Sequence, residues 1–271
     1  MKIEFNFDIE LTSLCNARCI FCPHDKVVRK RGVMKEVLVD KIVEEISAIN
    51  RHVNVRVGFA GMGEPLLKMD LLRKAVYRLH QERIPVIVVT NGERLKDEAT
   101  DIMEKIQSIM ISFSGYDKQS YEAIHGLDYE KVLKNIEFAQ QKFPGKITIQ
   151  CVLLPEIKKR RQEIDTFWKQ MEIKVSFVPL HTRGGFMTNL EVGRERRLQC
   201  LTFPCNIFRK VNFISSDGLI LSCCHDIQQE NIIGDCRKMT QEQILAEKES
   251  WAALNPKGFR ICQHCVDFSL D

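Results

Sequence analysis

The chain has 271 residues, 44% of them hydrophobic and 28% charged, the composition of a globular protein with a sizeable core. Its 40 basic and 36 acidic residues leave a net charge of +4, which is too balanced to indicate binding to nucleic acid or a membrane surface. No stretch approaches the roughly 18–20 apolar residues of a membrane-spanning helix, and the start of the chain carries acids where a signal peptide needs an apolar segment. We therefore expect a cytoplasmic protein without nucleic-acid or membrane partners. The basic run Lys26–Arg31 is expected to be a solvated loop, with contact to a phosphate or an acidic substrate as the alternative.

Strands and helices alternate along the first two thirds of the chain. Alternating or continuous apolar runs predict strands, and amphipathic periods predict helices. The expected strands are 6–12, 55–59, 85–90, 108–114, 146–154 and 174–180; the expected helices are 35–48, 71–81, 95–106, 131–141 and 161–171, with a looser helical stretch near Tyr121. Such alternation forms a parallel sheet covered by helices. Since six units are too few for a closed eight-stranded barrel, we predict an α/β fold, a partial (βα)6 TIM-like barrel whose functional residues follow the strand ends.

The pattern changes after residue 185. Segments 210–215 and 219–222 flank Ser216-Asp217-Gly218, which indicates a β-hairpin, and a helix is expected over 241–252. We expect a domain boundary near residue 195, which separates a core (1–195) from a small C-terminal domain (196–271). The second domain is too short for a large core, so we expect a metal cluster to stabilise it.

Three cysteines follow the first expected strand, in the pattern Cys15-x3-Cys19-x-Phe21-Cys22. Cysteines of a reducing compartment are more often metal ligands, catalytic thiols or core residues than disulfides. Three thiolates at this spacing can bind three irons of a cubane cluster and leave the fourth iron open. Structural zinc is the main alternative, but it needs four ligands, and His24 would be a tight fit so close to Cys22.

In this context the motif resembles that of the radical S-adenosylmethionine (SAM) superfamily. The resemblance implies a [4Fe-4S] cluster on Cys15, Cys19 and Cys22, whose open iron binds the amino and carboxylate groups of SAM. In that family one electron from the cluster cleaves SAM to methionine and a 5′-deoxyadenosyl radical, which removes a hydrogen atom from an inert carbon. A flavodoxin- or ferredoxin-type electron donor is the implied partner.

A second signature, Gly61-Met62-Gly63-Glu64-Pro65, follows the second expected strand. It resembles the Gly-Gly-Glu motif of the same family, which implies that Gly61, Gly63 and Glu64 hold the SAM ammonium. Alone it would be an ordinary Gly–Pro turn; its position one βα unit after the cysteines gives it weight. Weaker cofactor-binding candidates at later strand ends, any of which is also consistent with strand capping, are Thr90, Asn91, Ser112 and Ser114.

The C-terminal cysteines form a second set. Cys205, Cys223 and the pair Cys262-x2-Cys265 resemble the auxiliary-cluster domain called twitch, a truncated relative of SPASM. The resemblance implies that these four bind a second [4Fe-4S] cluster; structural zinc on the same thiolates is the alternative. The chain ends six residues after Cys265, so we expect one auxiliary cluster rather than the two of SPASM.

Both domains together resemble twitch-bearing dehydrogenases of aminocyclitol antibiotic pathways. The resemblance implies that a secondary alcohol of a sugar or cyclitol is oxidised, with the auxiliary cluster accepting an electron. The segment 181–185 then looks like a substrate-contacting segment, in which Arg183 binds the substrate or assists proton loss. A surface salt bridge is an equally good interpretation of Arg183.

Three other functions stay open. A radical epimerase would return a hydrogen atom from a thiol, for which Cys224 and Cys236 are candidates, although each is also consistent with simple packing or with a place as an alternative cluster ligand. A maturase of ribosomally made peptides often carries an N-terminal leader-peptide domain, which we do not expect here because the first strand begins almost at Met1. A zinc-stabilised binding module would have no catalytic activity. Cys151 is expected in the core, and no role is assigned to Cys200.

Overall fold

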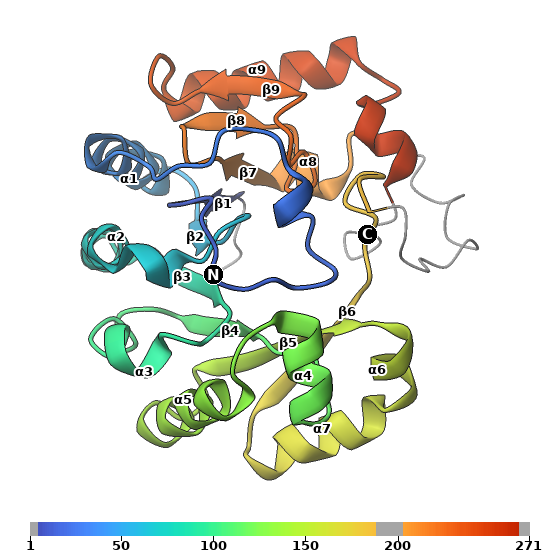
Figure 1. Ribbon diagram of the computed structural model, residues 1–271. Helices are drawn as coiled ribbons and strands as arrows, with labels where there is room; N and C mark the ends of the chain where they lie inside the picture. Colours follow the sequence, from blue (N-terminus) through green and yellow to red (C-terminus); the bar gives the residue numbers. More distant parts are fainter. Residues whose placement is uncertain (1–4, 188–202, 266–271) are drawn as a thin grey trace.

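The structure is a computed structural model that describes residues 5–187 and 203–265. Its described strands form one continuous sheet in the order β6-β5-β4-β3-β2-β1-β7-β8-β9 (Figure 1). Every neighbouring pair from β6 to β7 is parallel, whereas β7–β8 and β8–β9 are antiparallel. The strands are β1 Phe5–Ile9, β2 Val55–Phe59, β3 Val86–Thr90, β4 Ser108–Ser112, β5 Ile147–Leu153, β6 Lys174–Pro179, β7 Val211–Ile214, β8 Leu219–Leu221 and β9 Ile232–Asp235.

Helices connect the parallel strands and cover the outer face of the curved sheet. In Figure 1 the helices α1, α2, α3 and α5 line one side of it, and α9 lies beyond β8 and β9. The α-helices are α1 Glu36–Asn50, α2 Met69–Gln81, α3 Leu95–Glu98, α4 Lys118–His125, α5 Tyr129–Lys142, α6 Pro155–Lys159, α7 Arg161–Gln170, α8 Asn206–Lys210 and α9 Gln241–Leu254; short 3₁₀ segments are His24–Lys26, Pro65–Lys68 and Arg260–His264. The predicted α/β partial barrel is confirmed.

Strand alternation separates the core from the concave side of the sheet. In β2 the side chains of Val55, Val57 and Phe59 are fully buried on the helix-covered face, whereas Arg56 and Gly58 on the other face are only partly buried. The same alternation continues in neighbouring strands, so solvent reaches the concave side. We call this side the lumen; its partly exposed positions include Asn6, Asp8, Arg56, Gly58, Ile87, Val89, Met110, Ser112, Thr148 and Gln150.

The helix predicted over 95–106 is wrong in its second half. Helix α3 ends at Glu98, and the chain continues in turns closed by bonds such as Ile102 N to Ala99 O and Lys105 N to Ile102 O. Ile102 and Ile106 are nevertheless buried, as the apolar spacing required. Successive three-residue turns place the same apolar side chains in the core, so periodicity alone did not distinguish them from a helix.

The C-terminal hairpin is part of the core sheet. Strand β7 pairs in parallel with β1, Asn6 opposite Val211 and Ile9 opposite Ile214, and β8 and β9 extend the sheet. Strand β9 was not predicted, because four residues that include a glycine give no periodic signal. The expected boundary at residue 195 lies outside the described residues, so the division into two domains stays a prediction. No helix in the described part of the chain combines the length and apolarity needed to cross a membrane.

Candidate functional site

The loop after β1 (residues 13–23, the cysteine loop) carries Cys15, Cys19 and Cys22, all partly buried. Burial raises the pKa of the Cys15 thiol to about 11, with a further contribution from nearby Cys22. Burial also raises the pKa of Cys19, and both neighbouring thiols add to that effect. The three sulfurs are therefore close enough for their charges to interact. No group of three or more His, Cys, Asp or Glu among the described residues is arranged to hold a single metal ion; cluster binding by these cysteines stays a prediction.

The C-terminus of α4 supports the cysteine loop. The amides of Arg18 and Ile20 donate to the carbonyl oxygens of His125 and Ile124, each at 2.9 Å. The His125 ring lies beside the loop, with Nδ1 3.2 Å from the sulfur of Cys19. Sequence reasoning missed His125, because a single histidine at the end of an amphipathic helix belongs to no motif.

The segment after β2 (residues 61–65, the glycine loop) packs directly on the cysteine loop. The amide of Glu64 donates to the carbonyl oxygen of Leu14 at 2.9 Å. A Cβ atom on Gly63 would lie within 2.5 Å of the same oxygen and closer still to the Thr12 carbonyl. Only glycine permits this approach, which brings the two predicted motifs together.

The Glu64 carboxylate is occupied by donors from the protein. It is 3% exposed and accepts hydrogen bonds from the Thr90 hydroxyl at 2.7 Å, the Asn91 amide at 2.8 Å and the Leu66 amide at 3.0 Å. Burial raises its pKa to about 7, and these hydrogen bonds oppose the rise. This geometry makes Glu64 a group that fixes the glycine loop to the end of β3. Its contact with SAM stays a prediction, as do those of Gly61 and Gly63.

The end of β3 also reaches the cysteine loop. The Asn91 side chain donates to Oδ1 of Asn16 at 2.9 Å, and the Asn16 amide in turn donates to Glu93. Thr90 and Asn91, both predicted from their position at the end of a strand, therefore lie at the same site as the cysteines, and their contact with a cofactor stays a prediction.

The two serines of β4 and its end differ in surroundings. Ser114 is fully buried; its hydroxyl accepts from the Val152 amide at 2.9 Å and also bonds to the thiol of Cys151, itself buried in β5 as expected. The amide of Ser114 donates to Nε2 of His125 at 2.8 Å. These bonds favour a structural role for Ser114. Ser112 is partly exposed on the lumen side and stays a candidate for ligand contact.

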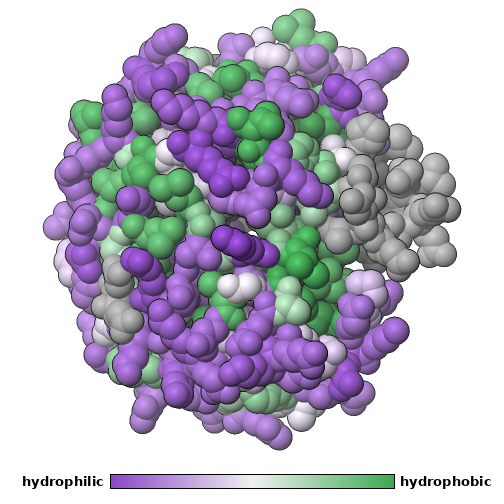
Figure 2. Space-filling model, viewed as in Figure 1, coloured by the Kyte–Doolittle hydropathy of each residue, from purple (hydrophilic) through white to green (hydrophobic). Residues whose placement is uncertain are grey.

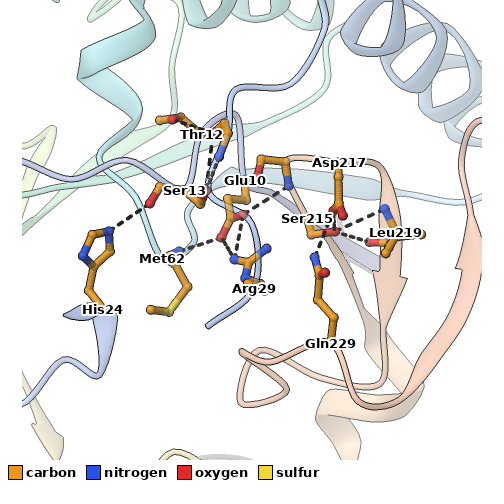
Figure 3. Close-up of polar contacts among 12 residues, drawn as sticks. Glu10, Thr12, Ser13, His24, Arg29, Met62, Ser215, Asp217, Leu219 and Gln229 are labelled. Atoms are coloured by element: carbon orange, nitrogen blue, oxygen red, sulfur yellow. Dashed lines mark hydrogen bonds and ion pairs between the residues drawn. The ribbon is translucent and has the colours of Figure 1, made fainter. Parts of the chain in front are cut away.

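A buried ion pair behind the site was not foreseen (Figure 3). Glu10 is 1% exposed and accepts from Nη2 of Arg29 at 2.8 Å to each carboxylate oxygen. It also accepts from the amide of Met62 in the glycine loop at 2.8 Å and that of Ser216 in the β7–β8 turn at 3.1 Å. A Cβ on Gly61 would lie 2.6 Å from the Glu10 side chain. The basic run was predicted to be solvated; for Arg29 that is wrong, because its charge is paired inside the protein.

The lumen carries an acid between β1 and β2. Asp8 lies over Gly58, where a Cβ would overlap its carboxylate. Burial raises the pKa of Asp8 to about 6, and the Arg56 charge opposes the rise. From the described residues its carboxylate receives no hydrogen bond. Asp8 was missed because an acid within a strand carries no signal of its own.

The C-terminal cysteines converge in part. Cys205 precedes α8, Cys223 follows β8 and Cys262 lies in the last 3₁₀ segment. Burial raises the pKa of Cys223, and Cys224 and Cys262 contribute. The buried Lys248 has its pKa lowered to about 8 by burial, while Cys205 and Cys223 oppose that change. The Cys265 amide donates to the Cys262 carbonyl at 3.2 Å. Cys223 is therefore near Cys224 and Cys262, and Lys248 is near Cys205 and Cys223; cluster binding by Cys205, Cys223, Cys262 and Cys265 stays a prediction.

The segment after β6 lies between the two cysteine sets. Burial raises the pKa of Cys22, and the Arg183 guanidinium opposes that rise, so this arginine is near the first set. A Cβ on Gly184 would lie 3.1 Å from Ile261, the neighbour of Cys262 in the second set, and 3.7 Å from the His225 carbonyl. Arg183 has a φ of +50°, a left-handed conformation that costs energy for a non-glycine residue and that it shares with Arg83, Glu172 and Gln229.

The two candidate hydrogen-atom donors are placed differently. Cys236 is 1% exposed, follows β9 and accepts from Nε2 of Gln241 at 3.3 Å. It belongs to the hydrophobic core, and its role as a hydrogen-atom donor stays a prediction. Cys224 is partly buried near Cys223, and its role as a hydrogen-atom donor stays a prediction. Cys200 lies outside the described residues.

Comparison with known proteins identifies a family and several relatives. The model of the radical SAM superfamily matches residues 9–167. An uncharacterized protein of Methanocaldococcus jannaschii is 30% identical over 136 residues, 49% of this chain and 43% of that protein. A GTP 3′,8-cyclase of Clostridium botulinum is 25% identical, covering 95% of this chain and 75% of the cyclase. The S-adenosyl-L-methionine-dependent 2-deoxy-scyllo-inosamine dehydrogenase of Niallia circulans is 21% identical, covering 99% and 95%. The chain spans less than half the length of the first curated relatives it matches, 43% and 26%.

Solved structures share the fold. BtrN in complex with AdoMet and 2-DOIA superposes with a TM-score of 0.67 at 20% identity, covering 99% of this chain and 95% of BtrN. Streptococcus suis SuiB bound to its precursor peptide SuiA gives a TM-score of 0.75 at 13% identity, covering 98% of this chain and 72% of SuiB. At these identities the likeness concerns the fold alone.

Proposed function

The chain belongs to the radical SAM superfamily, and from that premise we propose that it oxidises a secondary alcohol of a sugar or cyclitol by SAM-dependent hydrogen-atom abstraction. Family membership implies a [4Fe-4S] cluster and SAM, which would supply a 5′-deoxyadenosyl radical when bound. The close packing of the glycine loop on the cysteine loop, which requires glycine at position 63, carries the SAM-cleaving part of the proposal. The choice of a cyclitol alcohol is supported by the likeness to the 2-deoxy-scyllo-inosamine dehydrogenase of Niallia circulans.

The residues present fit these two groups. Cys15, Cys19 and Cys22 would hold the cluster on a loop fixed from behind by α4. The glycine loop would hold SAM beside it. Because the Glu64 carboxylate is used by Thr90, Asn91 and Leu66, we propose that backbone carbonyls of this loop take the SAM ammonium while Glu64 fixes the loop.

The lumen suits a hydroxyl-rich substrate. Asp8 is a partly exposed residue there, and its carboxylate receives no hydrogen bond from the described residues, so it can accept one from a substrate hydroxyl and then its proton. Arg183, near Cys22, would orient the substrate. The atoms and electrons of the oxidation then balance as follows. The hydrogen atom of the carbinol carbon would go to the 5′-deoxyadenosyl radical, the hydroxyl proton would go to Asp8, and one electron would remain for an acceptor.

A second cluster is the proposed electron acceptor. Cys205, Cys223, Cys262 and Cys265 would hold it, and the buried ammonium of Lys248 beside two of them would offset the negative charge of the thiolates. A flavodoxin- or ferredoxin-type protein would deliver electrons to the first cluster.

A deuterium-transfer experiment tests this function. Anaerobically reconstituted protein is incubated with SAM, a reductant and a panel of cyclitols and aminocyclitols, including 2-deoxy-scyllo-inosamine, deuterated at the carbinol carbons. We expect deuterium in 5′-deoxyadenosine and a ketone product, and we expect Asp8→Asn to lower ketone formation at least tenfold.

Other outcomes would replace the proposal. Solvent deuterium in a stereoinverted alcohol, lost in Cys224→Ala, would show an epimerase. Deuterium transfer from a peptide only would show a peptide-modifying enzyme. Zinc without iron in the purified protein would reject the radical reaction altogether.

A further inference from the structure

The hydrogen bonds of His125 determine which of its ring nitrogens carries the proton. The amide of Ser114 donates to Nε2 at 2.8 Å, so Nε2 is the nitrogen with the free lone pair. In a neutral imidazole the other nitrogen then bears the hydrogen. Nδ1, which lies 3.2 Å from the sulfur of Cys19, is therefore a donor, and the sulfur is its acceptor.

Independent contacts hold the ring in this orientation. The histidine is fully buried, its ring stacks on Tyr121 with centroids 4.7 Å apart, and Phe21 of the cysteine motif meets it edge-on at 5.6 Å. The carbonyl oxygen of His125 itself accepts from the Arg18 amide at 2.9 Å. Helix α4 thus binds the cysteine loop through backbone and side chain together, and the ring is held by packing against Tyr121 and Phe21 and at both nitrogens by polar partners.

We propose that His125 is a positioning residue of the first cluster, which holds the Cys19 sulfur through its Nδ1–H and raises the reduction potential of that cluster. The proposal rests on the proposed function in that it assumes cluster binding by Cys19. A donor to a ligating sulfur withdraws electron density from it and stabilises the added negative charge of the reduced cluster. The residue belongs to no part of the cysteine motif, and its partner Ser114 acts through the main chain.

Two amide variants separate the two ring nitrogens. In His125→Asn the side-chain amide can occupy the place of Nδ1 and still donate to Cys19; in His125→Gln it reaches the place of Nε2 and can accept from Ser114 but no longer donates to the sulfur. The measurement is an anaerobic, EPR-monitored reductive titration of the reconstituted full chain without substrate, in which the first cluster is identified by the change of its signal on addition of SAM.

We expect one-electron reduction to become about tenfold less favourable in His125→Gln, a shift of about 59 mV to more negative potential. His125→Asn should lie closer to the parent protein. Equal potentials in parent, Asn and Gln variants, or equal shifts in both variants, would overturn the proposal, because a purely structural role would not distinguish them.

A second readout covers variants that lose the cluster. Pulsed EPR on the parent protein labelled with ¹⁵N-histidine should show a histidine nitrogen coupled to the reduced first cluster, and its absence would also overturn the proposal. Both readouts are independent of turnover. If the parent makes 5′-deoxyadenosine and the His125→Gln variant shows no shift in reduction potential, this inference alone is refuted. If the parent does not bind iron, the proposed function is refuted.

Discussion

At the scale of single residues, the site depends on how closely two loops approach. Gly63 lies against the carbonyl oxygens of Thr12 and Leu14, which are backbone atoms and do not move aside easily. Gly32, whose carbonyl oxygen accepts from the Ser13 amide of the cysteine loop, has nothing within 4 Å of the position of a Cβ. The two glycines therefore form a matched pair for substitution.

Gly63→Ala should separate the glycine loop from the cysteine loop. We expect a loss of about 1–3 kcal/mol in the free energy of unfolding, from overpacking against rigid backbone, and weaker SAM binding. Gly32→Ala should stay within about 0.5 kcal/mol of the parent. Urea unfolding and calorimetric SAM titration measure both; equal effects of the two substitutions would contradict the geometry.

Asp8 should make stability depend on pH. Burial raises its pKa to about 6 from 3.8, so between these values the folded chain keeps a proton that the unfolded chain has lost. The free energy of unfolding therefore falls as pH rises through this interval. Relative to the parent, Asp8→Asn should gain about 1–2 kcal/mol between pH 4 and 7, less than the full shift because Asp8 is partly exposed. A difference independent of pH in urea titrations would show that Asp8 is not perturbed.

At the scale of elements, Glu10 connects four segments. It is the first residue after β1 and binds Arg29, the glycine loop and the β7–β8 turn, as Figure 3 shows. Because the pair is buried, removal of one charge leaves the other without compensation.

Glu10→Gln should lower the free energy of unfolding by about 3 kcal/mol. The double variant Glu10→Gln/Arg29→Met should be more stable than Glu10→Gln alone, because no uncompensated charge remains. The control is the exposed pair Arg73–Asp101, for which Asp101→Asn should cost less than about 1 kcal/mol. Similar losses for the buried and the exposed pair, measured by thermal and urea unfolding, would contradict this account.

Sequence patterns predicted the parallel elements well because each has a strong local signal. The apolar run of β3 and the amphipathic period of α2 lie almost where they were expected. The motifs also located the cysteine and glycine loops at one site. What the patterns missed depends on tertiary contact: His125 meets Cys19 across 106 positions of sequence, and Glu10 meets Ser216 across 206. Such pairs have no spacing rule, so no local pattern reveals them.

At the scale of the whole molecule, one sheet links both cysteine sets. The first set follows β1, and β7 lies beside β1 and leads through β8 to Cys223. Figure 1 shows β7, β8 and β9 continuing the sheet past β1. Figure 2 shows hydrophilic and hydrophobic residues interspersed over the side of the molecule that both figures view. The C-terminal strands are therefore hydrogen-bonded to β1, the strand that leads into the cysteine loop.

This coupling predicts cooperative unfolding. Native-state hydrogen exchange of the reconstituted protein should give the amides of β7 and β1 the same free energy of opening, within about 1 kcal/mol. Calorimetry should show one transition for both parts. Early exchange of β7 with β1 still protected would instead indicate a C-terminal unit that unfolds independently.

The central claim is that this chain uses three cysteines and the adjoining glycine loop to cleave SAM reductively. The most direct measurement is mass-spectrometric detection of 5′-deoxyadenosine after anaerobic incubation of the iron- and sulfide-reconstituted chain with SAM and a strong reductant. We predict formation that depends on both iron and reductant and is abolished in Cys19→Ala. Formation of no 5′-deoxyadenosine by protein with a full complement of iron, or equal formation by Cys19→Ala, would contradict the account.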